Sequence, residues 1–141
     1  MNKYTGFDYS QLLEDNTSSY KGKHEIVITN AKHIFDLMIK ILDDPELTLE
    51  YRKKLLSVIG YFILPKDLYP EDEYGAIGYV DDILASLKVI KEIEESPLVS
   101  PLDGLWNGKL PLDELLNRHY ENLRNDYSDL FYELIEYLGL N

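Results

Sequence analysis

The chain has 141 residues, of which 45% are hydrophobic, enough for one domain with a single core. Its formal net charge of −12 argues against nucleic-acid binding and against adhesion to an anionic membrane surface, since both depend on Lys and Arg. The absence of cysteine excludes disulfides and thiolate metal sites. It is also compatible with a reducing cytoplasm, where we expect the protein to reside, because the chain does not open with a signal-peptide pattern.

The first segment, Met1–Lys23, is polar and rich in Tyr, and Asn16–Ser19 reads as a loop. We expect an N-terminal arm or a short helix that docks on the body of the protein. Residues 24–141 are expected to form one helical domain.

Apolar residues recur at the three-four spacing of a helix face in four further segments. The predicted helices are Glu25–Leu42, Thr48–Leu64, Ile77–Glu95 and Leu112–Leu138. The sequence therefore predicts an all-α fold, a bundle of about four helices. Its longest apolar run is much shorter than the roughly 20 residues that span a bilayer, so we expect no transmembrane segment. The predicted core contains Ile34, Phe35, Met38, Leu55, Val58, Phe62, Leu84, Leu87, Leu123 and Leu130.

Two of the three loops between these helices each contain more than one proline. The segment 96–111 holds three prolines and two glycines and is expected to be a long ordered loop or hinge, with Trp106 filling a place in the core. The other loop joins the second and third predicted helices and is crowded with carboxylates. We call its acidic residues the acidic corner: Asp67, Glu71, Asp72, Glu73, Asp81 and Asp82.

Two half-motifs in this region occur together and in order. The first half-motif consists of Pro65, Asp67, Leu68, Pro70 and Glu71. The second consists of Gly78, Tyr79, Asp81 and Asp82 and opens a helix. The region of about residues 55–90 thereby resembles the YkvA-like domain family, although Glu71 replaces the more usual Asp and the linker before Gly78 is one residue longer. The resemblance implies a helical domain, with no established enzymatic activity.

The acidic corner has three interpretations. In the first, its carboxylates are structural, with Asp67 accepting backbone hydrogen bonds and Asp81 or Asp82 lying near a helix N-terminus. In the second, Asp67, Asp81 and Asp82 hold a hard divalent cation, Mg²⁺ or Ca²⁺. In the third, the corner is a partner surface, with tyrosines interleaved among the acids. Those tyrosines are Tyr61, Tyr69, Tyr74 and Tyr79, of which Tyr61 and Tyr79 have a second interpretation as core residues.

Two hypotheses for function follow. The leading one is a non-enzymatic helical module that binds a protein partner or assembles as a homo-oligomer, because no nucleophile is paired with a base and no glycine-rich phosphate loop occurs. The alternative is a divalent-metal protein, such as a metal-dependent phosphoesterase, that uses the acidic corner. The histidines His24, His33 and His119 are widely separated, and we expect His33 to be packed or half-exposed rather than a ligand.

The structural interpretation predicts that Asp67→Asn is tolerated better than Asp67→Ala. Pro65 and Pro70 lack backbone donors, so the N–H groups of the residues between them need the Asp67 side chain as an acceptor, and each bare donor costs about 1–3 kcal/mol. A metal ligand predicts the opposite, since Asn removes the charge that the cation needs. Thermal melts of both variants with and without chelator distinguish the cases: if Asn harms as much as Ala and chelator removes the difference from wild type, Asp67 is a metal ligand.

Overall fold

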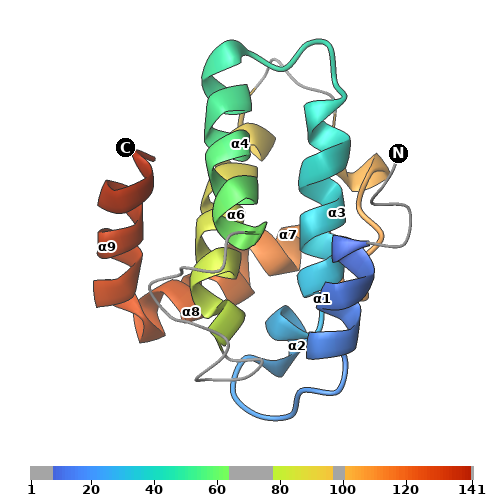
Figure 1. Ribbon diagram of the computed structural model, residues 1–141, viewed down its shortest axis with the longest axis vertical. Coiled ribbons are helices and arrows are strands. Elements are labelled where there is room, and N and C mark those ends of the chain that lie inside the picture. The colour runs from blue at the N-terminus through green and yellow to red at the C-terminus, as the bar shows by residue number, and fades with distance from the viewer. Residues whose placement is uncertain (1–7, 64–77, 97–100, 141) are drawn as a thin grey trace.

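The computed structural model describes residues 8–63, 78–96 and 101–140, and within these ranges the chain is helical and contains no strand (Figure 1). The all-α prediction is therefore confirmed, although the helices are shorter and more numerous than the expected four. The α-helices are α1 (Tyr9–Thr17), α2 (Glu25–Ile28), α3 (Ala31–Leu42), α4 (Leu49–Ile63), α6 (Val80–Glu94), α7 (Leu112–Glu114), α8 (Tyr120–Asp126) and α9 (Ser128–Leu138).

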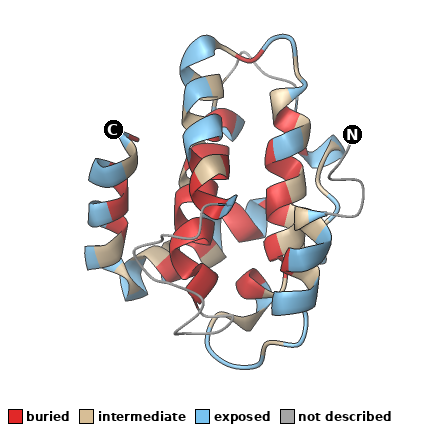
Figure 2. Cartoon of the chain, viewed as in Figure 1, coloured by how far each residue is buried: buried red, intermediate tan, exposed pale blue. Residues whose placement is uncertain are grey.

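Helix α6 lies at the centre of the fold. It packs against α2, α3, α4, α8 and α9, so neighbours cover it on several sides. Nearly every residue of its first three turns is buried (Figure 2). A helix that is covered all round must be apolar all round or must pair its polar groups internally. The Oγ of Ser86 follows this rule by donating to the carbonyl oxygen of Asp82 at 2.7 Å.

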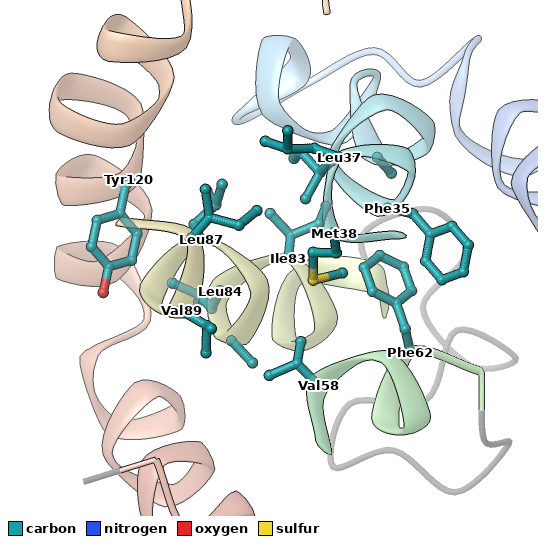
Figure 3. Close-up of a cluster of buried hydrophobic side chains, with 14 of the residues drawn as sticks. Phe35, Leu37, Met38, Val58, Phe62, Ile83, Leu84, Leu87, Val89 and Tyr120 are labelled. Carbon is teal, nitrogen blue, oxygen red and sulfur yellow. The ribbon is translucent and has the colours of Figure 1, made fainter. Parts of the chain in front are cut away.

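The core forms where α3, α4 and α6 meet (Figure 3). Phe62 of α4 is fully buried, and its ring lies 5.6 Å from that of Phe35 on α3, at an angle of 73°. Edge-to-face aromatic pairs of this kind add to the gain from burial. The predicted core is confirmed for every residue except Leu130, which is only partly buried.

The N-terminal segment forms the expected short helix in its described part. Asp8 caps α1 by accepting a hydrogen bond from the N–H of Gln11 at 3.2 Å. Leu13 is fully buried, and α1 packs on α3. The hydroxyl of Tyr9 donates to the carbonyl oxygen of Phe62, so α1 also closes over the C-terminal end of α4.

The first predicted helix, Glu25–Leu42, is broken in the structure into α2 and α3. The break falls at Thr29 and Asn30, and Asn30 is a fully buried polar residue. Its Nδ2 donates to the carbonyl oxygen of Ile26 at 2.7 Å, and its Oδ1 accepts from the N–H of Lys109 at 3.0 Å. Asn competes in this way with helical backbone bonds, and here it also ties α2 to a distant loop.

The last predicted helix, Leu112–Leu138, is also interrupted. A π-helical turn occupies Leu115–His119, and the backbone leaves helical geometry at Tyr127, with φ −125° and ψ 43°. The extra residue of a π turn and the break at Tyr127 both shift which side chains face inward. Leu130 is consequently half-buried and Tyr137 exposed, whereas Phe131, Leu134 and Ile135 are the buried residues of α9.

The loop that carries Trp106 packs on the edge of the core instead of filling its interior. Trp106 is partly buried, and its Nε1 donates to the carbonyl oxygen of Leu110 at 2.7 Å. A Cβ on Gly108 would lie 1.9 Å from the indole ring, so the chain requires glycine there. The His33 ring lies edge-on, 6.3 Å away, and is half-buried as expected; burial and the neighbouring Lys32 lower its pKa.

None of the helices within the described ranges is long and apolar enough to cross a membrane. This finding agrees with the prediction made from the length of the apolar runs.

The packing predicts that Phe62→Ala destabilises the protein by about 3–5 kcal/mol, because it removes a fully buried aromatic ring and leaves a cavity. The matched control is Tyr132→Ala, an exposed aromatic on α9 that should cost within about 0.5 kcal/mol. Urea denaturation of the two variants measures both values. Equal midpoints for Phe62→Ala and wild type would show that this side of α4 does not support the core.

Candidate functional site

The second half-motif lies at the start of the central helix. Gly78 and Tyr79 form a buried turn, and Asp81 and Asp82 occupy the first turn of α6 with none of their surface exposed. Carboxylates are rarely buried to this extent, because desolvation of the charge is costly unless it is compensated. The N-terminus of a helix supplies part of that compensation through its dipole.

Asp81 is held by hydrogen bonds to both of its carboxylate oxygens. The hydroxyl of Tyr61, on α4, donates to Oδ2 at 2.8 Å, and the backbone N–H of Asp82 donates to Oδ1 at 3.0 Å. Bonds to a charged acceptor are stronger than neutral ones. Asp81 therefore links the start of α6 to the last turn of α4.

Tyr61 and Tyr79 are both buried, so these two tyrosines belong to the core, as their second interpretation predicted, and do not line a partner surface. Tyr79 packs against Phe62, with ring centroids 6.3 Å apart, and its hydroxyl accepts a hydrogen bond from Nδ2 of Asn16 at 3.0 Å. The two side chains connect α6 to α4 and α1. Tyr69 and Tyr74 lie outside the described residues.

The first half-motif is not placed by the structure. Pro65, Asp67, Pro70 and Glu71 lie outside the described residues, as do Leu68, Asp72 and Glu73. Of the three predicted metal ligands, only Asp81 and Asp82 can be located. Among the described residues, His, Asp and Glu side chains do not gather in any group of three that could hold a metal ion.

Helix α4 is fixed on its neighbours by basic side chains. Arg52 donates to the carbonyl oxygen of Leu42, the last residue of α3, at 2.8 Å and to that of Asp44, just beyond it, at 3.3 Å. Lys54 pairs with Glu92 of α6 at 3.0 Å. Burial raises the pKa of Glu92, but hydrogen bonds from Lys88 and Lys54 outweigh it and hold that pKa below its usual range. These contacts determine which side of α4 faces solvent.

The solvent side of α4 carries a row of large apolar side chains. Leu49, Leu56 and Ile63 are 66%, 53% and 48% exposed and lie seven residues apart. Side chains at this spacing fall on nearly the same side of a helix, two turns apart. We call Leu49, Leu56 and Ile63 the α4 row. Helix α9 carries two exposed tyrosines, Tyr132 and Tyr137, which are 70% and 63% exposed; because they are five residues apart, they lie on different sides of that helix.

The sequence analysis did not identify the α4 row, although its seven-residue spacing is visible in the sequence. The apolar stripe used to predict the core of α4 lies on its opposite side, at Leu55, Val58 and Phe62. Two apolar stripes on one helix indicate two contact surfaces, and only one of them is covered by the described part of the chain.

The segment that contains Tyr61, Asp81 and Asp82 is similar to a known protein family. Residues 52–86 match the model of the family described as "Protein of unknown function (DUF1232)". The resemblance to the YkvA-like family is thereby confirmed over these residues. The DUF1232 segment runs from the first turn of α4 to the middle of α6, so it includes Tyr61, Asp81 and Asp82.

Similarity extends beyond the DUF1232 segment in one curated protein. The chain is 25% identical over 131 residues to "Uncharacterized protein ORF9" of Methanothermobacter thermautotrophicus, and the match covers 93% of this chain and 90% of that protein. No solved structure matches the chain significantly. These relatives carry no assigned activity.

The geometry predicts that Tyr61→Phe destabilises the protein by about 1–3 kcal/mol, because it removes a donor from a buried carboxylate while leaving the ring in place. Tyr132→Phe, at an exposed position, is the matched control and should be neutral within about 0.5 kcal/mol. Thermal and urea unfolding measure both. Identical stability of Tyr61→Phe and wild type would show that the bond to Asp81 does not stabilise the start of α6.

Proposed function

We propose that this protein is a non-enzymatic interaction module whose contact surface is the solvent side of α4. The observation that carries the proposal is the α4 row, Leu49, Leu56 and Ile63. Single exposed leucines are ordinary on protein surfaces. Three large apolar side chains at a constant seven-residue spacing line up along one side of the helix, and a second apolar row of this kind on an already packed helix favours a contact site.

Exposed tyrosines on α9 support the same kind of function. Tyr132 and Tyr137 are among the most exposed large hydrophobic side chains in the described part of the chain. Tyr is enriched at the centres of protein interfaces, since it gives a large rigid contact area at low entropic cost. The rings of Tyr137 and Tyr61 are in contact, with centroids 5.9 Å apart, so α9 touches α4 at this point.

The motif carboxylates support a structural rather than a catalytic role. Asp81 and Asp82 are inaccessible to solvent, and both oxygens of Asp81 accept hydrogen bonds from this chain's own groups. We infer that the second half-motif positions α6 and, through Tyr61, the C-terminal end of α4. On this proposal the second half-motif orients α4 and is not itself the site of binding.

A divalent-metal site at the acidic corner is the alternative, and it depends on Asp67 joining Asp81 and Asp82. Buried carboxylates at one helix start favour it chemically, because oxygen ligands suit Mg²⁺ and Ca²⁺. The bonds that already engage Asp81 speak against that residue as a ligand. The melts of the Asp67 variants with and without chelator distinguish the two proposals.

The contact surface is tested by Leu56→Glu, which places a charge in the middle of the exposed row. Leu12→Glu is the matched control, since Leu12 is a partly exposed leucine on α1 and does not belong to the α4 row. Both variants should melt like wild type. Quantitative affinity capture from an extract of the source cells should show a specific partner or further copies of the chain bound to wild type and Leu12→Glu. Binding to Leu56→Glu should be at least tenfold weaker.

The control variant decides how the capture experiment is read. Equal binding by Leu56→Glu and Leu12→Glu would contradict the proposed surface. A lower melting temperature for Leu56→Glu alone would show that Leu56 contributes to folding, and Leu49→Glu then repeats the test at the most exposed leucine of the row.

A further inference from the structure

Gly60 lies between the last two members of the α4 row, where the fold of this chain does not require a glycine. It is inside α4, and glycine is among the least favourable residues in a helix. Its φ is not positive, and a Cβ added to it would have no atom of the described chain within 4 Å. Neither backbone conformation nor crowding therefore accounts for this glycine. A second backbone packed closely against it would do so.

Together with the α4 row, Gly60 and Lys53 form a continuous stripe along one side of the helix. Its members recur at alternating intervals of four and three residues, which is the spacing of a coiled-coil seam. Each of them is exposed or partly exposed. This pattern favours another helix as the structure that packs here. We call this set the α4 stripe: Leu49, Lys53, Leu56, Gly60 and Ile63.

We propose that α4 of a second copy of the chain packs on the α4 stripe, antiparallel to the first and with the two-fold axis close to Leu56. The inference rests on the proposed contact surface and specifies what occupies it. Leu56 then meets its own counterpart, and Leu49 meets Ile63 of the other copy at both ends of the contact. The same surface serves both copies, as in every isologous dimer.

Side-chain size selects the antiparallel direction. Lys53 lies three residues before Leu56 and Gly60 lies four residues after it, so antiparallel helices bring the long Lys53 of one copy over the small Gly60 of the other. The methylene stem of a lysine packs on apolar surface while its amino group reaches water. Parallel helices would instead set Lys53 against Lys53, where like charges repel, and Gly60 against Gly60, where a void would remain.

Charge and surface shape also favour a second copy on this side of α4. With a net charge of −12, two copies of the chain repel each other in general. The exposed charged residues of α4 are Glu50 and Lys53, which cancel, so this side adds no local repulsion. Leu49 lines a surface depression of about 480 Å³ at the N-terminal end of the stripe. Antiparallel pairing brings Ile63 of the other copy to this depression.

Disulfide cross-linking of the full-length chain tests the pairing directly, because the chain contains no cysteine of its own. Leu56→Cys should give a covalent dimer on mild oxidation with copper phenanthroline, since the two-fold axis brings the two thiols together. Leu49→Cys and Ile63→Cys should each stay monomeric alone and should cross-link when they are mixed before oxidation. Leu12→Cys, at a partly exposed leucine on α1, is the matched control and should stay monomeric.

Gly60→Leu tests the close approach of the two helices. Leucine is more favourable than glycine in a helix, and the position is open, so this variant should melt no lower than wild type. Its dimer dissociation constant, measured by analytical ultracentrifugation, should rise by roughly tenfold or more, because the new side chain holds the backbones apart. Gly104→Leu makes the same change at an equally open glycine outside α4 and should leave the dimer unchanged.

The other outcomes would overturn the inference. A wild-type chain that stays monomeric at millimolar concentration excludes the dimer, and equal cross-linking of Leu56→Cys and Leu12→Cys shows random collision. Self-cross-linking of Leu49→Cys contradicts the antiparallel direction. Equal dissociation constants for Gly60→Leu and wild type contradict the close approach.

The proposed function can survive the failure of this inference. It stands if Leu56→Glu loses a captured protein other than this chain that Leu12→Glu retains. The two proposals therefore fail separately.

Discussion

Burial of α6 is the constraint on which the rest of the structure depends. A central helix with neighbours on several sides needs short helices that can be set around it at different angles. The breaks at Asn30 and Tyr127 supply those changes of direction, so α2 and α3, and likewise α8 and α9, contact α6 as separate elements. A bundle of four long straight helices would leave part of α6 exposed.

Burial of α6 also explains why the second half-motif contains an aspartate, Asp81, at the start of this helix. The first turn of a buried helix presents backbone N–H groups that have no partner within the helix. Asp81 brings a carboxyl group to that positive end, where its oxygens accept hydrogen bonds from Tyr61 and from the N–H of Asp82. The match to the DUF1232 family covers this same junction of α4 and α6. On the proposed function, the packing of these two helices is the reason for the residues of the second half-motif.

The solvent side of α4 is what remains once the core is complete. Helix α4 uses Leu55, Val58 and Phe62 to cover α3 and α6, and its salt bridge from Lys54 to Glu92 holds that orientation. The α4 row, Leu49, Leu56 and Ile63, is then directed to solvent. On the proposed function, the contact surface is the side of α4 that the fold leaves uncovered.

The sequence by itself determined the helical class, most of the core and the family motif, because three-four apolar spacing and proline or glycine positions are local properties. Nearly every predicted core residue is buried, and the match at 52–86 follows from linked half-motifs. The tertiary structure alone decided the break at Asn30, the inward side of α9, the burial of Tyr61 and the exposure of Leu56. Periodicity shows that a helix has an apolar side, but whether that side is covered depends on residues far away in the chain.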